Sequence, residues 1–333
     1  MRPLIAVDAM GGDHAPTEIV AGALLAVKEL DANVLLVGRD DVVEPLLPSG
    51  NLPTGVEFFA AKEEIEMGED PIAAVRNKKD SSIVQAMNAV KDGRASAVVS
   101  AGNTGAVTTA AVLRLGRFKG VPSPAIAVPI PVAGSHSQIL VDAGAVLDPA
   151  PERLVQYALM ACEYVRARWG VDKPRVGLLS VGSEKGKGDE LRRNTYPLLE
   201  KALPSFVGNV EGSDFMKSDR VDVIITDGFT GNIALKSLEA ALRSLAKMVF
   251  SVIDINEETR AAGEVLLPHF LQAASLYDPD VTGGALLLGI KGVTVISHGS
   301  SSARAIVSSI AVAAECAQRN VVDHMKEAVT DAS

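Results

Sequence analysis

The sequence predicts an α/β fold: a three-layer α/β/α sandwich around a largely parallel sheet, with a protruding helical hairpin. Short apolar runs alternate with amphipathic stretches along most of the 333 residues. The runs are rich in Val and Ile without in–out alternation, which is typical of strands buried on both faces. Interleaved helices then place the sheet between two helical layers. With 47% hydrophobic and 22% charged residues, the chain can bury a large core, and we expect 1–333 to form a single domain.

The expected strands are short runs that end in turn residues. The first strand is followed by an amphipathic helix at 17–30. In chain order, strands are predicted at 3–9, 33–38, 56–61, 96–101, 125–132, 138–144, 175–182, 221–228 and 292–299. Pro129 and Pro131 interrupt one of these runs. Because proline cannot donate a ladder hydrogen bond, that run is expected to be an edge strand or to contain a bulge.

The region 233–277 departs from this alternation. Two helix-like segments follow one another there with no strand between them, which predicts a helical hairpin that stands off the sheet. Its expected tip and return are apolar: Met248, Val249, Phe250, Val252, Ile253, Leu266, Leu267, Phe270 and Leu271. So many apolar groups need a partner surface, which can be a second subunit, the bilayer interface or both. The alternative is that the hairpin folds onto its own core.

Charge and cysteine content limit the class of protein. A net charge of −9 disfavours nucleic acid as the main partner, because phosphate-backbone binding needs a dense positive surface. An acidic partner would need a local basic patch, and the sequence offers several, each of which can equally be solvated surface. The candidates are Arg114, Arg117 and Lys119, then Arg192 and Arg193, and less favoured, the basic residues of 166–175.

The cellular compartment is predicted from the low cysteine content and from the lengths of the apolar segments. Cys162 and Cys316 are too few for a disulfide framework or a metal cluster, which favours a reducing cytoplasm. The first apolar run is too short for a signal peptide, and no apolar segment reaches roughly 20 residues. No His, Asp and Glu set has metal-ligand spacing, so we expect no metal and no other cofactor.

Four Gly-rich turns follow predicted strands and open predicted helices. They are "DAMGGDHAPTE" (8–18), "SAGNTGAV" (100–107), "TDGFTGNI" (226–233) and "SHGSSSARAI" (297–306). A helix N-terminus binds anions through unpaired N–H groups and its dipole. Ligands of open α/β sheets gather at the carboxyl ends of strands, so we expect the four turns to line one cleft.

In "DGFTGN", glycines allow close backbone approach, and Thr230 can cap the helix or bind an oxyanion. Asn232 can donate an amide, while Asp227 can orient a donor, receive a proton or simply form the turn. Asn103 and Thr104 hold the corresponding positions of "AGNTG". His298 ends a strand at the same expected cleft edge, where it can be either functional or structural.

The loop "VGSEKGKGDE" resembles a nucleotide-binding loop but has one residue too few before its lysine and no Ser or Thr after it. The sequence thus excludes a Walker loop. What is left is a flexible loop after a strand, whose Lys185 and Lys187 can close over an anion. A plain surface loop is the alternative.

Taken together, the motifs resemble a known family. "AVDAMGGDHAP", "SAGNTGA", "DAGA", "VGLLSVGSEKGKG", "FVGNVEG", "DGFTGN" and "HGSSSARAI" occur in the order found in bacterial acyl-ACP:phosphate acyltransferases, the PlsX family of phospholipid synthesis. The resemblance spans 3–325. It implies the fold of the isocitrate and isopropylmalate dehydrogenase group, which phosphotransacetylases share.

The resemblance also implies a reaction, in which fatty acyl-ACP and inorganic phosphate give acyl phosphate and free ACP. A downstream membrane acyltransferase would pass the acyl group to glycerol 3-phosphate. Catalytic roles are expected for Asp227, Asn232, Lys185 and His298. Phosphate is expected to lie against Gly12, Asn103, Thr104, Thr230 and Gly231. Acidic ACP is expected to bind Arg114, Arg117, Lys119, Arg192 and Arg193.

On the same resemblance, the protein is expected to be a homodimer in the cytoplasm, peripherally associated with the inner face of the cell membrane. Three other functions stay open. The chain can be a phosphotransacetylase-like enzyme that uses acyl-CoA, a nicotinamide dehydrogenase of the same fold group, or a non-catalytic membrane scaffold for lipid enzymes. The dehydrogenase would require an Asp cluster for a divalent metal and an adenine-ribose site, and neither is visible in the sequence.

Overall fold

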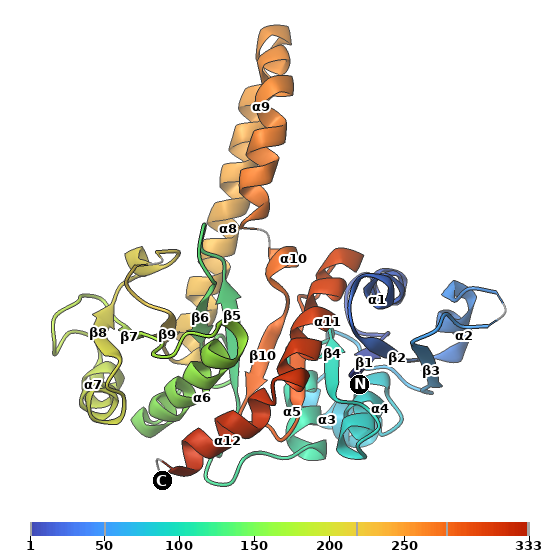
Figure 1. The fold of residues 1–333 in the computed structure, drawn as a ribbon, viewed down its shortest axis with the longest axis horizontal. Helices are drawn as coiled ribbons and strands as arrows, with labels where there is room; N and C mark the ends of the chain where they lie inside the picture. Colours follow the sequence, from blue (N-terminus) through green and yellow to red (C-terminus); the bar gives the residue numbers. More distant parts are fainter. Residues whose placement is uncertain (1, 50, 218, 278, 332–333) are drawn as a thin grey trace.

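A single sheet of eleven strands runs through the centre of the protein in a computed structural model, which describes residues 2–49, 51–217, 219–277 and 279–331 (Figure 1). The spatial order is β3-β2-β1-β4-β11-β10-β5-β6-β9-β7-β8. The strands are β1 (Leu4–Asp8), β2 (Asn33–Gly38), β3 (Val56–Ala60), β4 (Ala97–Ser100), β5 (Ala125–Ile130), β6 (Gln138–Val141), β7 (Val176–Leu179), β8 (Phe206–Val210), β9 (Val223–Ile225), β10 (Ala285–Leu288) and β11 (Val293–Ile296).

The sheet consists of two parallel blocks that run in opposite directions. Strands β3, β2, β1, β4 and β11 form one block, and β6, β9, β7 and β8 form the other. Between them, β10 is antiparallel to both β11 and β5, and β5 is antiparallel to β6. The prediction of a largely parallel sheet is confirmed, and the change of direction is confined to its centre.

Helices cover both faces of the sheet, as the apolar pattern predicts. They are α1 (Thr17–Glu29), α2 (Asp40–Val43), α3 (Pro71–Asn77), α4 (Ser82–Lys91), α5 (Thr104–Arg114), α6 (Pro151–Trp169), α7 (Glu190–Ala202), α8 (Gly228–Ile253), α9 (Glu257–Ser275), α10 (Pro279–Thr282), α11 (Ala303–Gln318) and α12 (Val321–Asp331). One buried core packs α1, α6, α7, α11 and α12 against one face of the sheet. The cores on the other face are covered by α3, α4, α5 and the lower part of α8. The α/β/α sandwich is therefore confirmed.

The proline-containing strand β5 lies inside the sheet, so the expectation of an edge strand is wrong. Its first half pairs with β10 through Ala125–Ala127, and its second half pairs with β6 through Val128–Ile130. Pro129 therefore lies beyond the residues that pair with β10. The missing N–H costs no ladder bond on that side, and Pro129 instead lines a cavity.

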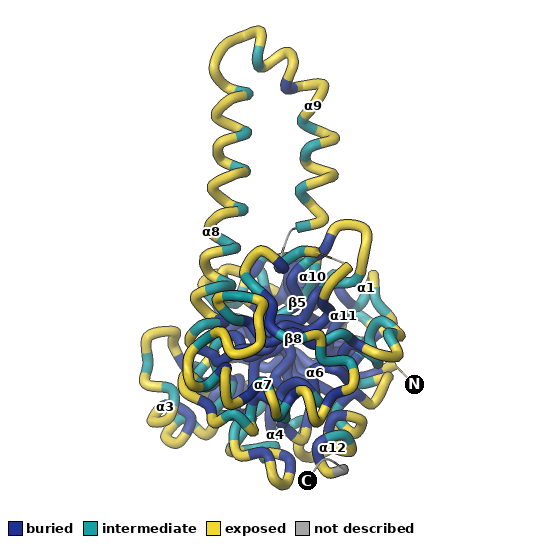
Figure 2. Tube along the Cα trace, turned by 90° about the vertical axis from the view of Figure 1, so that its left-hand side faces the viewer, coloured by how far each residue is buried: buried dark blue, intermediate teal, exposed yellow. Residues whose placement is uncertain are grey.

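The helical hairpin projects from the body of the protein (Figures 1 and 2). Its two helices, α8 and α9, are exposed along most of their length. They contact each other through groups such as the rings of Phe250 and Phe270, whose centroids lie 6.5 Å apart edge to face. The alternative in which the hairpin folds onto its own core is wrong.

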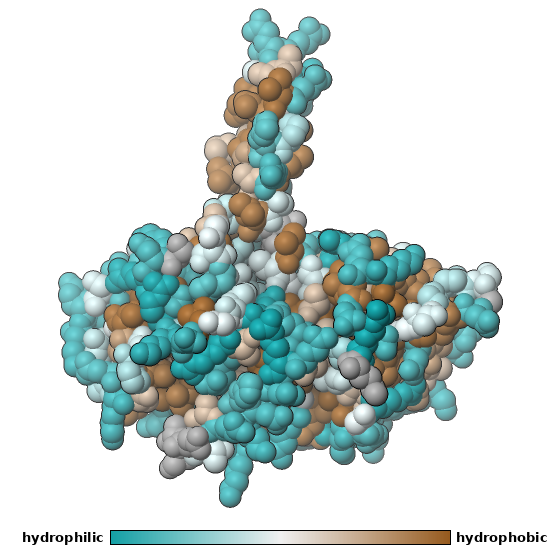
Figure 3. Space-filling model, viewed as in Figure 1, coloured by the Kyte–Doolittle hydropathy of each residue, from teal (hydrophilic) through white to brown (hydrophobic). Residues whose placement is uncertain are grey.

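Much of the hairpin's apolar surface faces outward. Exposed side chains on it are Leu245, Met248, Phe250, Val252, Ile255, Val265, Leu266 and Leu271. In Figure 3 hydrophobic side chains gather along the shaft, whereas the end of the hairpin is hydrophilic. That end carries Asp254, Glu257 and Glu258. In the described part of the chain, every helix is too short or too polar to cross a membrane.

Candidate active site

A cavity of about 550 Å³ lies between α8 and the centre of the sheet. Side chains of β5, including Ile126, Val128 and Ile130, form part of its wall. The turns after β1, β4 and β11 reach it through Asp13, Thr104 and His298, and the first turns of α8 reach it through Asn232. The four Gly-rich turns therefore meet at one cavity, as their sequence predicts.

Three of these turns are bound to one another by polar contacts. Asp8, at the end of β1, accepts a hydrogen bond of 2.6 Å from the Ser100 hydroxyl at the end of β4. Burial raises the pKa of Asp8 above its ordinary value, against the opposing effect of these hydrogen bonds. Gly11 has no room for a side chain, because a Cβ there would lie 2.7 Å from both Asp8 Oδ2 and the Gly102 nitrogen. The Asp13 N–H donates to the Gly299 carbonyl at 2.7 Å and ties in the third turn.

The start of α8 packs against the turn that follows β6. Buried Asp142 organises this turn by accepting hydrogen bonds from backbone N–H groups, including that of Val146 at 2.7 Å. The Val146 carbonyl accepts in turn from the Gly228 N–H at 2.8 Å. A Cβ on Gly231 would overlap the Asp142 carbonyl oxygen. Both glycines of "DGFTG" therefore allow close packing of α8 onto the turn, which fixes where α8 begins.

One side of α8 presents polar groups to the cavity. The Asn232 amide donates to the Ala143 carbonyl at 3.2 Å. One turn later, the Lys236 ammonium lies 3.2 Å from Nε2 of His298 and 3.2 Å from a carboxylate oxygen of Glu239. Nδ1 of the same ring lies 2.8 Å from the Ser300 hydroxyl and accepts from the Ser300 N–H at 3.3 Å.

Lys236 is a site residue that sequence reasoning missed. It lies four positions after Asn232, so both side chains point to the same face of a helix. This four-residue spacing, in the first helix-like segment of the predicted hairpin, is the sequence signal that could have identified Lys236.

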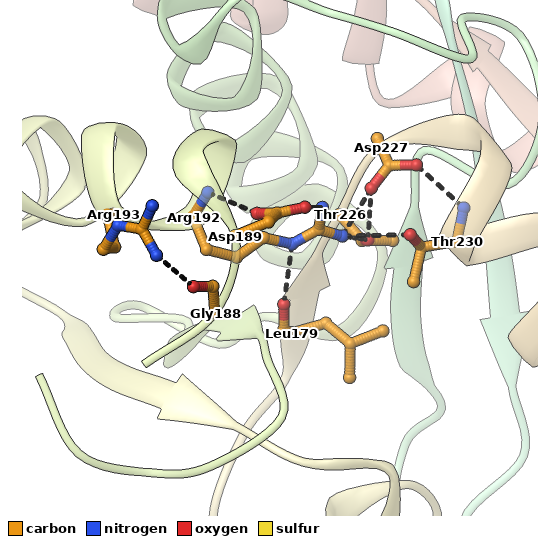
Figure 4. A network of polar contacts seen from close by, with 8 residues as sticks. All are labelled: Leu179, Gly188, Asp189, Arg192, Arg193, Thr226, Asp227 and Thr230. Atoms are coloured by element: carbon orange, nitrogen blue, oxygen red, sulfur yellow. Dashed lines mark hydrogen bonds and ion pairs between the residues drawn. The ribbon is translucent and has the colours of Figure 1, made fainter. Parts of the chain in front are cut away.

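Asp227 lies behind the cavity, in a buried network centred on Arg192 (Figure 4). Its carboxylate caps α8 by accepting from the Thr230 N–H at 2.8 Å, and it is ion-paired with the Arg192 guanidinium. Arg192 also donates to the Thr226 hydroxyl at 2.7 Å and the Leu179 carbonyl at 3.2 Å. Burial alone would raise the pKa of Asp227, but the hydrogen bonds from Thr230 and the charge of Arg192 hold it below the ordinary value. Asp227 is therefore an ionised carboxylate that positions α8, and it does not line the cavity.

The structure brings Thr104, Asn232 and His298 to the cavity, while other expected site residues lie elsewhere among the residues described. Gly231 and Thr230 belong to the packing and capping of α8. Asn103 caps α5 and donates to the Met67 carbonyl at 2.7 Å, so it shapes the rim. Gly12 adopts a φ of +117° beside the Gly299 turn. These four residues lie next to the residues that line the cavity but do not line it themselves.

Lys185 lies on the surface of its loop rather than over the cavity. Its ammonium pairs with Glu200 at 2.7 Å and lies 5.1 Å from the centre of the Tyr196 ring. This loop is linked to α8 indirectly, because Asp189 at its end pairs with Arg192 at 2.9 Å. A role for Lys185 in catalysis stays a prediction that requires movement of the loop.

The expected ACP-binding residues do not form one patch. Arg192 is buried, with only 8% of its side chain exposed, so its expected role at a partner surface is corrected to an internal one. Arg193 is exposed and donates to the Gly188 carbonyl. Arg114 lies at the end of α5 opposite Thr104, about 15 Å away at 1.5 Å per residue. Exposed Arg117 and Lys119 follow it, away from the cavity.

Comparison with known proteins decides the family. The model of a family described as fatty acid synthesis protein matches residues 4–324. The chain belongs to this family. A phosphate acyltransferase from Desulfitobacterium hafniense is 44% identical over 323 residues, which cover 97% of this chain and 96% of the relative. Another from Desulforudis audaxviator is 43% identical over 327 residues, covering 98% and 96%. The resemblance inferred from the motifs is confirmed, and the chain is an enzyme of the acyltransferase class.

Solved structures share the fold at low sequence identity. A phosphotransacetylase from Streptococcus pyogenes superposes with a TM-score of 0.65 at 16% identity, covering 95% of this chain and 94% of that one. A 4-hydroxythreonine-4-phosphate dehydrogenase from Klebsiella pneumoniae gives 0.55 at 14% identity, covering 96% and 100%. The fold is thus one that acyltransferases and dehydrogenases both use, and function depends on the cavity.

Proposed function

We propose that the protein transfers a fatty acyl group from acyl-ACP to inorganic phosphate, giving acyl phosphate and free ACP. The observation that carries this proposal is the cavity, where Asn232, Lys236 and the turn bearing His298 meet beside apolar side chains. One wall offers donors to an anion, and the other offers apolar surface to an acyl group. The phosphate acyltransferases that are similar to this chain support the choice of acceptor.

The chemistry needs positioning more than a strong base. Near neutral pH inorganic phosphate is largely dianionic, so one of its oxygens can attack the thioester carbonyl carbon directly. A C–O bond forms, the C–S bond breaks, and the electron pair leaves with sulfur. Holding the reactants in contact can supply roughly 7 to 11 kcal/mol of the barrier.

Charge develops on the carbonyl oxygen during attack, and donors already in place stabilise it. Lys236 supplies a cation, and Asn232 and Thr104, which also line the cavity, supply neutral donors. Thr104 is the first residue of α5, whose dipole adds positive potential. The departing thiolate needs no acid at the moment of cleavage, because a thiol pKa of about 8.5 makes it a good leaving group. It takes its proton from solvent afterwards.

We propose that the donor is ACP-bound because α8 continues beyond the cavity with basic residues. Arg243 lines the cavity, and exposed Lys247 follows one turn later. An acidic carrier docked there would deliver its thioester along the helix towards Lys236. The cluster around Arg114 lies farther from the cavity and is the weaker candidate surface.

The test is incubation of the protein with palmitoyl-ACP and phosphate, followed by direct detection of palmitoyl phosphate and of free ACP by mass spectrometry. We expect acyl phosphate and free ACP in equal amounts, with palmitoyl-CoA a poorer donor. A preference for palmitoyl-CoA would favour the phosphotransacetylase-like alternative. A protein that forms no acyl phosphate from either donor would contradict the proposed function and favour the scaffold alternative.

We further propose that the apolar shaft of the hairpin pairs with the same shaft of a second copy, making a homodimer. Most of the exposed apolar side chains lie along α8 and α9, while the end of the hairpin carries Asp254, Glu257 and Glu258 together with Ile255 and Arg260. An acidic end is repelled by the anionic inner face of a membrane, whereas apolar shafts bury one another. Any membrane contact would then use apolar side chains that the dimer leaves uncovered.

The hairpin pairing is tested with Leu266→Glu, which places a charge on an outer position that is 62% exposed. We expect a dimer of the wild-type chain in sedimentation velocity and a monomer of the variant. Val281→Glu, on a residue that is 57% exposed outside the two long helices, is the matched control and should remain dimeric. A variant that stays dimeric while losing flotation with anionic vesicles would overturn the pairing and assign the shaft to the membrane.

A further inference from the structure

The cavity has two different walls along the same helix. Leu235, Leu238 and Leu242 are spaced as one stripe of α8, and all three line the cavity. Lys236, Glu239 and Arg243 form the neighbouring stripe and line it too. Val128 and Ile130 of β5 line the cavity as well, and Leu235 and Leu238 pack against the buried cluster that includes Ile130. One side of the space is therefore apolar along its length, while the polar groups follow the other.

The volume is larger than the proposed acceptor requires. A space of about 550 Å³ falls within the range of sites that hold a whole organic ligand. From Asn232 to Leu242 the helix rises about 15 Å, so the apolar wall extends well beyond the groups that would bind phosphate. A second hollow of about 420 Å³ at the foot of the hairpin shares Pro131 and Thr282 with the cavity. Its other lining residues include Leu276 and Val281.

We propose that the leucine wall of this cavity holds the saturated tail of the acyl substrate, and that Leu242 limits the length of chain that fits. This inference rests on the proposed function, since it places the acyl group of that reaction. With the thioester carbonyl at Lys236, the tail runs along Leu238 to Leu242. Longer tails pass Leu242 towards the hollow at the foot of the hairpin.

Leu242 is the residue on which length selection can be tested without damage to the core. Leu235 and Leu238 pack against buried clusters, whereas half-buried Leu242 does not belong to them. Each methylene buried against this wall adds up to about fourfold to kcat/KM. A side chain at this position that displaces two or three methylenes should therefore lower the reaction of long chains by about 15- to 60-fold.

The experiment compares wild type, Leu242→Trp and Ser244→Trp with butyryl, octanoyl and palmitoyl thioesters of one carrier. Ser244 is on the same helix, is exposed and lies outside the cavity lining, so its variant is the matched control. We expect kcat/KM to rise with chain length in wild type and in Ser244→Trp. In Leu242→Trp the palmitoyl reaction should fall by the stated factor while the butyryl reaction is unchanged. An unchanged length profile in Leu242→Trp would overturn the inference.

A binding measurement keeps this test independent of turnover. Dansylaminoundecanoic acid, whose fluorescence rises in apolar surroundings, should bind wild type and be displaced by palmitate but not by butyrate. Leu242→Trp should weaken this binding at least tenfold, and Ser244→Trp should not. If the enzyme formed no acyl phosphate but still bound the probe in this pattern, the proposed function would fail while the apolar subsite stood. Equal binding by all three proteins would reject the subsite whatever the activity.

Discussion

Lys236→Ala is expected to lower kcat for phosphate-dependent acyl transfer by about 100- to 1,000-fold, the usual cost of removing a donor that stabilises a developing oxyanion. The ammonium of Lys236 lies 3.2 Å from Nε2 of His298 and lines the cavity beside Asn232. Its side chain is half exposed, so the substitution should leave the fold intact. Steady-state kinetics with saturating phosphate measure the effect.

Two further variants show whether charge or position matters at Lys236. Lys236→Arg keeps the cation and should retain more activity than the alanine variant. Lys247→Ala removes an exposed cation of the proposed carrier-docking surface, beyond the cavity lining, so it should raise KM for acyl-ACP and leave kcat unchanged. If Lys236→Ala raised KM for phosphate without lowering kcat, its role would be binding alone. Kinetics equal to wild type would remove Lys236 from the site.

Arg192→Leu is expected to lower the free energy of unfolding by about 3 to 5 kcal/mol, because it leaves the Asp227 carboxylate buried without its ion-pair partner. Only 8% and 6% of the two side chains are exposed. Urea unfolding at neutral pH measures the loss. Arg193→Leu changes the adjacent, exposed arginine and should have little effect, which makes it the matched control.

The same pair predicts how the loss depends on pH. The folded-state pKa of Asp227 lies below its ordinary value, so the pair contributes fully above the unfolded-state pKa of about 3.9 and less as the pH falls through the folded-state value. The difference between wild type and Arg192→Leu should therefore shrink in acid below about pH 4. A difference that stayed constant between neutral pH and pH 3 would contradict the ionised pair, even if the variant were unstable.

The sequence predicts the layers of this fold because a strand that is buried on both faces has a continuous apolar run. Apolar runs such as 3–9 and 33–38 became β1 and β2 in the interior of the sheet. The sequence did not reveal β10, since "ALLL" is a short apolar run that periodicity cannot separate from a helix. The apolar pattern of a strand also does not reveal in which direction the strand runs in the sheet. The reversal between the two parallel blocks is therefore seen only in the antiparallel pairing of β5 with β10 and β6.

The candidate site was partly predictable for a similar reason. Glycine residues mark the turns that follow strands in this sequence. The turns that contain Thr104, Asn232 and His298 do meet at one cavity. The individual roles depended on packing that no local pattern contains. Arg192 looks like its exposed neighbour Arg193 in sequence, yet it is buried because its side chain, in the first turn of α7, reaches Asp227 and Thr230 at the start of α8. Gly231 looked like an anion-binding glycine, and its constraint is instead the nearby Asp142 carbonyl.

One helix joins the cavity to the far end of the hairpin without a break. α8 has 26 residues and a length of about 39 Å at 1.5 Å per residue, and proline is absent from it. Near its start this helix is held by the tight contact of Gly231 with the Asp142 turn, and Asn232 and Lys236 follow within the next two turns. Because the same helix continues into the hairpin, we expect whatever holds the hairpin also to influence how Asn232 and Lys236 are oriented in the cavity.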